Sequence, residues 1–441
     1  MGAVRSFLAS TAWCVVRNPW PGHNDGVATD PMSPGHPIYT GYGIRRNLLR
    51  PDVSERAERV TYIELFFDLI FVFALTQLSR YLSENQAWVG ALESAILVLA
   101  LWWVWVYTTW VTNWLDPARL TVRGVVIGLA LVGLVVSTSI YESFGDRGLV
   151  FAIAYVVLQL GRTAFMLLAV ARHDRELHRT FVRILVWLGV AGVFWIVGAL
   201  VPLEYRLPLW LAALAIEYVS ASLGFRVPGL GRSGVEGWEL SGPHIAERSA
   251  VFVILALGES FLVTGFAFVA QESSLLGTIG LMFAFLSALS MWWLYFDYSE
   301  RAGAKALERS AEPGRVARTA YAYVHAVIIA GIVLCSVADK EILEHPADAM
   351  TLSTAVIVCG GPFLYILGMF LFRLRVTGEI LVSYLMGLGM LGLVFSLAVL
   401  GEPAVISPLA LGALSVGALV MVAAWETVVR VRSGKTDAAS G

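Results

Sequence analysis

The feature that most constrains the fold is a series of long apolar stretches separated by short polar breaks. A helix needs about 20 mostly apolar residues to cross the hydrocarbon core of a bilayer. Twelve stretches of this kind lie at about residues 61–82, 88–113, 123–141, 149–171, 181–201, 207–225, 244–268, 274–297, 317–337, 352–373, 380–400 and 405–428. Because hydrocarbon offers the backbone no hydrogen-bond partners, each stretch is expected to be helical. The sequence therefore predicts an all-α polytopic membrane protein with about twelve transmembrane helices.

The amino-acid composition supports this class and excludes others. Of the 441 residues, 58% are hydrophobic and 15% are charged, whereas roughly a quarter are charged in ordinary soluble domains. The formal net charge is −2, so no global basic field attracts polyanions. These values exclude a soluble enzyme, a disordered tail protein and a nucleic-acid binder, and they make the lipid bilayer the expected partner.

Lysine and arginine are distributed unevenly over the loops between the predicted helices. If the N-terminus is inside, the inside loops and the C-terminal tail carry 24 of these residues. The outside loops then carry four, Arg80, Arg147, Arg206 and Lys340. Inside loops of membrane proteins are enriched in Lys and Arg, so the sequence predicts that both termini are cytoplasmic.

The two halves of the chain resemble each other. Three pairs of segments match in order: residues 73–77 with 255–259, 101–105 with 291–295, and 160–161 with 367–368. This indicates two parallel six-helix repeats, at residues 61–225 and 244–428, joined by a cytoplasmic linker at 226–243 and followed by a cytoplasmic tail at 429–441. Parallel repeats occur in transporters, with the binding site between them. The alternative is that tryptophan pairs simply recur in a chain with 15 Trp.

Residues 1–60 differ from the rest of the chain. They contain six prolines, Pro19, Pro21, Pro31, Pro34, Pro37 and Pro51. We expect a flexible N-terminal extension here. Whether residues 1–31 belong to the mature protein stays open, because Met32 could be the true start and residues 7–16 form only a weak signal-peptide pattern.

Ionisable side chains inside the predicted spans are candidates for function, because they are costly to bury in a membrane. Glu64 and Asp68 are four residues apart and share one face of the first helix. Asp68 and Arg162, on the fourth helix, both lie about 10 Å from the inner surface. We therefore predict an Asp68–Arg162 ion pair, which either helps to form an inner gate or only holds helices together.

A second group of polar residues opens the seventh predicted helix, where Pro243 suits a helix start. His244 and Glu247 are three residues apart on one face, and Arg248 follows. We expect these three residues to lie near the inner headgroups. With Glu64, Asp68 and Arg162 they are the candidates for an inner gate of charge pairs, although Glu64 and Glu247 could also be simple headgroup-level residues.

Three further residues are candidates for binding a proton or another ion. Glu259 lies about 22 Å along the seventh helix, and Glu217 falls near the midplane, as does the polar Gln159. A buried carboxyl group without a cationic partner favours its protonated form and can carry a proton. His325 lies about 12 Å from the inside, where it is either a proton carrier or a satisfied core histidine.

Motifs of soluble chemistry are missing from the sequence. It has no Walker loop and no metalloprotease or nucleophile-elbow motif. The three cysteines, Cys14, Cys335 and Cys359, are scattered and fit no metal or disulfide framework. We expect neither a metal nor a cofactor, and we assign no catalytic residue. The tryptophan pairs are expected to be packing or interface residues.

Several of these residues also carry a family resemblance. The run from Glu64 to Ala74, the run from His244 to Arg248 that continues into residues 256–260, residues 161–163, and residues 292–296 resemble the signatures of the bacterial low temperature requirement protein A family. The likeness covers about residues 55–430. It implies a multi-pass protein of the bacterial inner membrane, and it implies no particular substrate or reaction.

Three functional hypotheses remain open at this stage. The first is a secondary transporter for a small solute or ion, with or without coupling to protons. The second is a cation channel lined by the first and seventh helices; Phe67-Asp68 with Phe71 loosely resembles the first helix of potassium channels built from six-helix repeats. The third is an enzyme that acts on a lipid near His244, Glu247 and Glu64. A purely structural role for the charge pairs also stays open, and the sequence does not reveal the substrate or the oligomeric state.

Overall fold

The computed structural model describes residues 48–50, 60–233, 241–272, 274–310, 313–401 and 406–439. Most of the predicted N-terminal extension lies outside these residues. Residues 48–50 are described, and they lie against the end of a helix. The backbone N–H of Arg50 donates to the carbonyl of Trp114 at 2.8 Å, and that of Asp116 donates to Leu48 at 2.9 Å. These three residues are therefore held against the helical bundle, and the flexibility of the rest of the extension stays a prediction.

Helices account for nearly all of the described chain, and the only β-type pairings there are two isolated bridges. The helices are α1 (Tyr62–Glu84), α2 (Trp88–Trp114), α3 (Leu120–Ser139), α4 (Gly148–Val170), α5 (Arg175–Leu200), α6 (Leu203–Ser222), α7 (Gly242–Ala270), α8 (Leu275–Leu294), η3 (Tyr295–Ser299), α9 (Glu300–Arg309), α10 (Pro313–Val316), η4 (Ala317–Val324), α11 (His325–Glu344), α12 (Leu352–Thr377), α13 (Val382–Leu400) and α14 (Pro408–Ala439). The predicted all-α class is confirmed.

Eleven helical segments in the described residues are long and apolar enough to cross a membrane. The sequence predicted twelve, and the segment that does not meet this standard is α6. It has 20 residues, but Glu204, Arg206 and Glu217 lie within it. Two of the eleven segments combine several helices: Leu275–Leu307 runs from α8 into α9, and Gly314–Glu344 runs from α10 through η4 and α11. The predicted tail at 429–441 continues α14 as far as Ala439.

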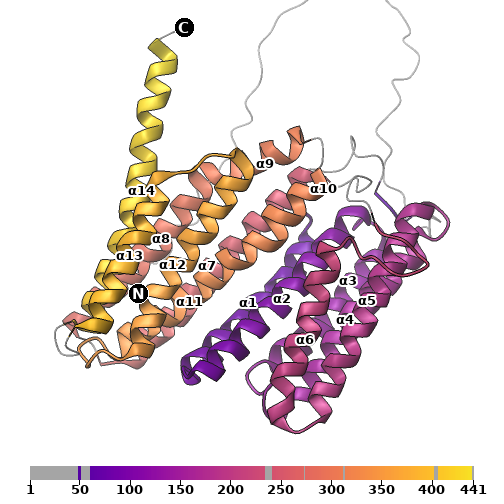
Figure 1. Ribbon diagram of the computed structural model, residues 1–441, viewed down its shortest axis with the longest axis horizontal. Helices are drawn as coiled ribbons and strands as arrows, with labels where there is room; N and C mark the ends of the chain where they lie inside the picture. The colour runs from indigo at the N-terminus through magenta and orange to yellow at the C-terminus, as the bar shows by residue number, and fades with distance from the viewer. Residues whose placement is uncertain are drawn as a thin grey trace, which may run out of the picture. The chain divides into compact units, whose positions relative to one another are not determined.

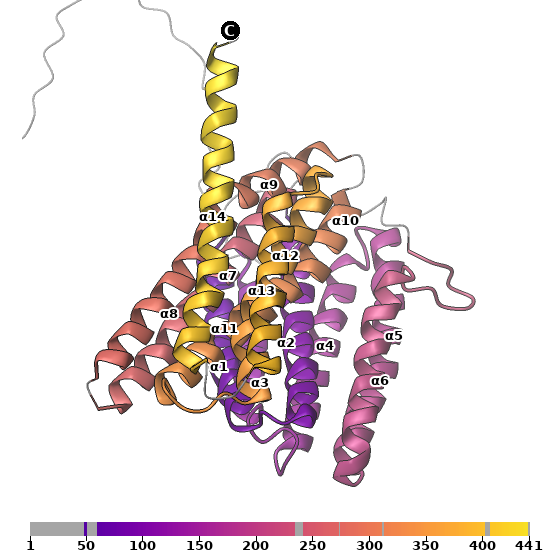
Figure 2. The same cartoon turned by 60° about the vertical axis from the view of Figure 1, so that its left-hand side comes forward.

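Within the body formed by residues 45–441, the helices fall into two groups (Figure 1). Helices α1 to α6 form one group, and α7 to α14 form the other. Contacts of α1 with α7 and α11, and of α2 with the same two helices, join the groups. Figure 2 shows the long α14 beside α8 and α13, with α5 and α6 as a hairpin on the opposite flank. Residues on α1, α2, α7 and α11 are thus the ones that meet at the centre.

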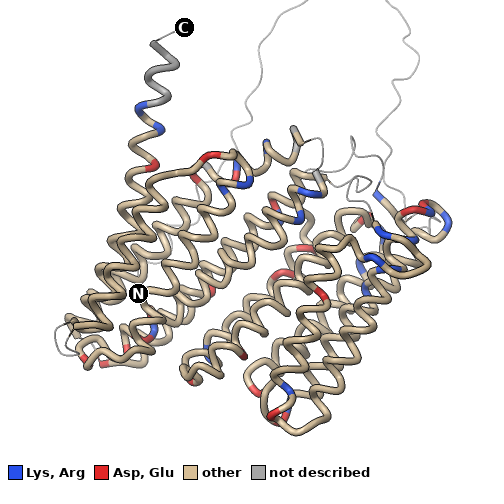
Figure 3. The backbone as a smooth tube through the Cα atoms, in the orientation of Figure 1, with Lys and Arg blue, Asp and Glu red and all other residues tan. Residues whose placement is uncertain are grey.

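Basic residues collect at one end of the bundle, the end at which α1, α3 and α5 begin (Figure 3). The opposite end carries few of them. This is the asymmetry from which cytoplasmic termini were inferred. The orientation of the chain stays a prediction from this charge distribution.

Helices α11 and α12 approach each other closely through glycines. A Cβ atom added at Gly331 would lie 2.5 Å from the backbone nitrogen of Tyr365, and one at Gly361 would lie 2.7 Å from that of Cys335. Small residues at a helix interface allow such approach and strengthen packing in membranes, where the hydrophobic effect does not drive helices together. This close pair positions the polar residues of α11 that are described below.

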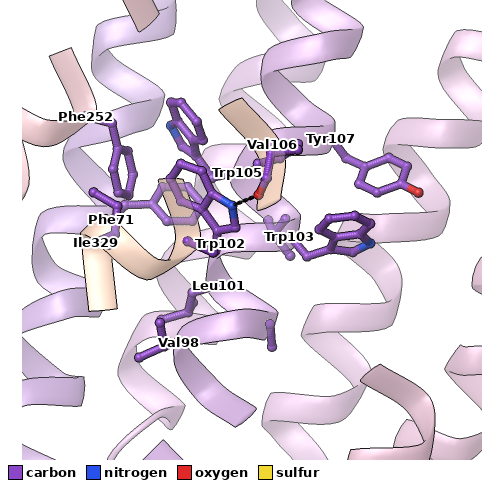
Figure 4. Packing of buried hydrophobic residues seen from close by; sticks show 14 of the residues in the cluster. Phe71, Val98, Leu101, Trp102, Trp103, Trp105, Val106, Tyr107, Phe252 and Ile329 are labelled. Carbon is purple, nitrogen blue, oxygen red and sulfur yellow. Dashed lines mark hydrogen bonds between the residues drawn. The ribbon is translucent and has the colours of Figure 1, made fainter. Parts of the chain in front are cut away.

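Aromatic side chains fill the centre of the bundle (Figure 4). The ring centroids of Trp102 and Trp105 are 4.8 Å apart, and that of Phe252 on α7 lies 4.6 Å from Trp105. These tryptophans are therefore packing residues. Trp292 and Trp293 on α8 differ, because they are 42% and 38% exposed on a surface that would face lipid or a partner.

Candidate functional site

Helices α1 and α7 run in the same direction and in register. Three side-chain contacts join them: Glu64 to His244, Asp68 to Arg248, and Ser79 to Glu259. In each contact the two residues are 180 positions apart in the sequence. A constant separation means that the two helices are parallel and that contacting residues lie at equal depth. Every candidate residue on these two helices therefore belongs to one interface, except Glu247.

Glu64 lies at the centre of the charged end of this interface, where its side chain is 0% exposed. Its Oε1 atom is 3.0 Å from His244 Nε2 and 3.2 Å from Arg248 Nη1. Its Oε2 atom accepts hydrogen bonds from the backbone N–H and the hydroxyl of Thr61, at 3.0 and 2.7 Å. Both carboxylate oxygens are thus satisfied, as a buried charge requires, and Glu64 lies inside the bundle at the start of α1.

Asp68 and Arg248 form the second layer of this cluster. Arg248 Nη2 lies 2.5 Å from Asp68 Oδ1, and both side chains are 0% exposed. The indole N–H of Trp105 donates to the same oxygen at 2.9 Å. Asp68 Oδ2 has no hydrogen-bond partner among the described residues. We call Glu64, Asp68, His244 and Arg248 the inner charge cluster.

Residues that the sequence analysis did not single out complete the cluster. The side-chain amide of Asn113 at the end of α2 lies 3.1 Å from His244 Nδ1 and also donates to the carbonyl of Ser241, at 3.1 Å. Arg50 reaches Glu64 Oε1 at 3.4 Å. Burial lowers the pKa of Arg50, and the nearby Glu64 opposes this shift. Asn113 and Arg50 carry no local sequence signal, because they reach the cluster only through the fold.

The predicted Asp68–Arg162 ion pair is wrong. Asp68 pairs with Arg248, while Arg162 on α4 donates to the carbonyl of Val104 and the hydroxyl of Thr108 on α2, each at 3.1 Å. Arg162 also donates to the side-chain oxygen of Gln159. The two residues share a depth, but they face different neighbours across α2.

Glu217 is the carboxylate that lies near Arg162, and it belongs to a separate polar cluster in the first helical group. Its Oε2 accepts hydrogen bonds from the Tyr155 hydroxyl at 2.7 Å and from Gln159 Nε2 at 3.3 Å. Its Oε1 accepts one from the Trp195 indole at 2.9 Å. Gln159 thus links Glu217 to Arg162, and both oxygens of Glu217 are occupied. We call Tyr155, Gln159, Arg162, Trp195 and Glu217 the outer-group polar cluster.

Glu247 does not join either cluster. It is half-buried, and its Oε2 accepts a hydrogen bond from the backbone N–H of Val60 at 2.9 Å. It therefore holds the chain segment that enters α1. This contact places Glu247 at the end of the bundle, as expected, without a charged partner among the described residues.

Glu259 lies deeper along the same interface, on the far side of the aromatic core from the inner charge cluster. Its side chain is 0% exposed. Oε1 accepts a hydrogen bond from the Ser79 hydroxyl at 3.0 Å, and that hydroxyl lies 3.1 Å from the hydroxyl of Ser336 on α11. Oε2 has no hydrogen-bond partner among the described residues, and no cation approaches the carboxyl group there. Glu259 thus has the environment that the sequence analysis expected.

His325 begins α11 directly after the π-helical turn η4. Its Nδ1 lies 2.8 Å from the carbonyl of Ala320, and its Nε2 lies 2.9 Å from the hydroxyl of Tyr295. A neutral ring that donates from Nδ1 and accepts at Nε2 satisfies both contacts. Tyr321 stacks on the ring at 4.9 Å, and Phe372 packs edge-on at the same distance. This geometry favours the interpretation of His325 as a satisfied core histidine.

Within the described residues, no group of three or more His, Cys, Asp or Glu side chains could hold a metal ion. Cys335 and Cys359 are buried and free. A buried carboxylate that the sequence analysis missed is Asp339 on α11, which is 7% exposed and lines a small cavity together with Ser287 and Ser415. A lone acidic residue near a predicted helix end gives no pattern by which to find it.

The fold and the buried charges define this chain as a multi-pass α-helical membrane protein. Residues 59–424 match the family model for the bacterial low temperature requirement A protein. An uncharacterized protein of Rhizobium meliloti (strain 1021) is 37% identical over 375 residues, which cover 84% of this chain and 89% of that protein. No solved structure matches this chain. The chain belongs to the bacterial low temperature requirement A protein family, as its motifs indicated.

Proposed function

We propose that this protein is a secondary transporter of a small solute or ion in the bacterial inner membrane, coupled to the movement of protons. The observation that carries this proposal is the α1–α7 interface. It holds a charged cluster at one end and an unsatisfied buried carboxyl group, that of Glu259, about four helical turns further along. Transport needs a closed barrier and a binding group inside the membrane, and this interface contains candidates for both.

The parallel arrangement of α1 and α7 supports a repeat of two six-helix units. Equal depth and equal direction are what a two-fold axis along the membrane normal would produce. In transporters built from such repeats, substrate and coupling ion bind between the units, near the midplane. The sequence separation of 180 between contacting residues is close to the offset of the first matching pair, residues 73–77 with 255–259.

Glu259 is the strongest of the three candidates for binding a proton. Only hydroxyl groups approach it, and one of its oxygens has no donor among the described residues. Glu217 receives three hydrogen bonds and lies near a guanidinium group through Gln159. A carboxylate held in this way is suited to fixing helices, so we assign Glu217 mainly to structure.

The inner charge cluster would act as the gate on the side where the basic residues collect. Opening of the gate would have to separate Arg248 from Glu64 and Asp68, or move all three residues together. Breaking a buried pair costs about 3–5 kcal/mol, so opening requires new partners for these charges. A substrate or water that enters between α1 and α7 would provide them.

A flux assay tests the proposal. Purified protein is reconstituted in liposomes that hold a pH-sensitive dye, and cations, amino acids and osmolytes are added in turn across an imposed pH gradient. We expect at least one solute to move protons in the wild type, and we expect Glu259→Gln to lower this flux at least tenfold. Glu142→Gln, in an exposed loop pair with Arg147, is the matched control and should retain the flux.

Two results would overturn the proposal. One is an unchanged proton flux in a folded Glu259→Gln variant. The other is stepwise unitary current in planar bilayers without saturation, which would instead indicate a cation channel.

A further inference from the structure

A small cavity lies between α8, α11, α12 and α14, away from the α1–α7 interface. Its volume is about 10 Å³, which is room for one water-sized sphere. The lining includes Asp339 from α11, Ser287 from α8, Val358 from α12 and Ser415 from α14. Four helices thus line one small cavity, and three of them, α8, α11 and α14, contribute polar side chains to it.

Asp339 is the only acidic residue among the cavity-lining residues. It is 7% exposed, and its Oδ2 atom has no hydrogen-bond partner in the part of the chain that the structure describes. The described residues also give it no ion pair. A buried carboxylate without a partner is costly in a membrane. We therefore expect the carboxyl group of Asp339 to bind a cation or a proton.

The other lining groups supply oxygen atoms. The hydroxyls of Ser287 and Ser415 are 2% and 1% exposed, and each has two acceptor lone pairs. Pro362 lies inside α12 and also lines the cavity. Because proline has no N–H, the carbonyl of Val358, four residues earlier, lacks its usual helical donor. The lining residues thus include one aspartate, two serines and Val358. The Ser415 hydroxyl also lies 3.7 Å from the Cys359 thiol.

We propose that this cavity is a binding site for one sodium ion. Oxygen ligands suit hard cations, whereas the thiols of Cys335 and Cys359 suit soft metals. A single carboxylate balances a single positive charge. Magnesium keeps several waters in an octahedral shell, for which the cavity has no room, so a monovalent alkali cation suits it better, and sodium is the ion that we test. Helices broken by proline present carbonyls to sodium in a similar manner in several transporters.

This site shares no residue with the proposed proton path through Glu259. Its occupancy can be measured at equilibrium without any flux. If transport assays fail, sodium binding remains testable, and if sodium does not bind, the proton-coupled proposal is unaffected.

The test uses the full-length protein in detergent. Binding of radiolabelled sodium is measured at constant ionic strength, with choline chloride replacing sodium chloride, and thermal unfolding is followed in parallel. We expect about one sodium ion per chain and a rise in unfolding temperature with sodium but not with choline, because a ligand that binds only the folded state stabilises it.

Two substitutions locate the site. Asp339→Asn should abolish saturable sodium binding, while Asp348→Asn, at an exposed acid that pairs with His345 beyond the end of α11, should leave it unchanged. Ser415→Ala keeps the carboxylate and should weaken binding about tenfold, which covers the case in which Asp339→Asn does not fold. Absence of saturable binding in the folded wild type, or equal binding in Asp339→Asn, overturns the proposal; the first result would mean that Asp339 holds only a proton.

Discussion

The carboxylate of Glu64 and the imidazole of His244 lie 3.0 Å apart and are separated by 180 residues in the sequence. Asp68 and Arg248, one turn further along both helices, have the same separation. Successive contacts at one spacing show that α1 and α7 are matched in depth along a shared interface. The charged residues of the two halves therefore neutralise each other directly.

Loss of Arg248 should destabilise the protein strongly. Arg248→Gln leaves Asp68 buried with only the Trp105 indole N–H, and removing one partner of a buried pair costs about 3–5 kcal/mol. Thermal unfolding in detergent, followed by tryptophan fluorescence, measures the effect. The double variant Asp68→Asn with Arg248→Gln should recover part of the loss.

The control is Arg80→Gln, which removes a pair with Glu84 in which the Arg80 side chain is 57% exposed. Such exposed pairs contribute about 0–1 kcal/mol. If Arg248→Gln unfolds at the same temperature as Arg80→Gln, the inner charge cluster contributes nothing to stability and our account of it fails.

The hydrogen bond from Tyr155 to Glu217 should be measurable. Tyr155→Phe removes the 2.7 Å bond without changing the ring, and a buried bond to a charged acceptor contributes about 1.5–3 kcal/mol. We expect a lower unfolding temperature, whereas Tyr205→Phe, at a tyrosine that is 54% exposed, should have no effect. Equal stability of the two variants would show that the outer-group polar cluster is not formed.

Replacing Gly331 or Gly389 by alanine should have opposite effects on the stability of the protein. Gly331→Ala places a Cβ atom 2.5 Å from the backbone of α12 and should destabilise by about 1–3 kcal/mol, as overpacking does. Gly389→Ala meets nothing within 4 Å and should stabilise by up to about 1 kcal/mol, because alanine is the better helix former. A neutral result at Gly331 would contradict the close packing of α11 and α12.

Labelling with an impermeant thiol reagent tests the orientation. In a chain with Cys14→Ser, Asp146→Cys should be labelled in intact cells, because the loop after α3 is predicted to be outside. Arg172→Cys should be labelled only after permeabilisation. Both positions are exposed. Cys335 and Cys359 are buried and should not be labelled. The reverse pattern would place the termini outside.

The class of the protein and its family could be predicted from the sequence because both depend on local features. An apolar stretch of about 20 residues forms a helix in a bilayer whatever its neighbours are, and the predicted stretches correspond to observed helices throughout. The family motifs at Glu64 to Ala74 and at His244 to Arg248 are likewise continuous in the chain. The exception is α6, where Arg206 and Glu204 make the segment less apolar than the other spans.

The pairing of the charges was decided only by the tertiary structure. The position of a residue along a helix gives its depth in the membrane, and Asp68 has two arginines near its depth, Arg162 and Arg248. The choice between them depends on which helices are neighbours and how each is rotated about its axis. The depth of a residue in the membrane determines neither of them. For the same reason Asp339 was missed: its cavity exists only where four helices meet, and no segment of the chain carries that information alone.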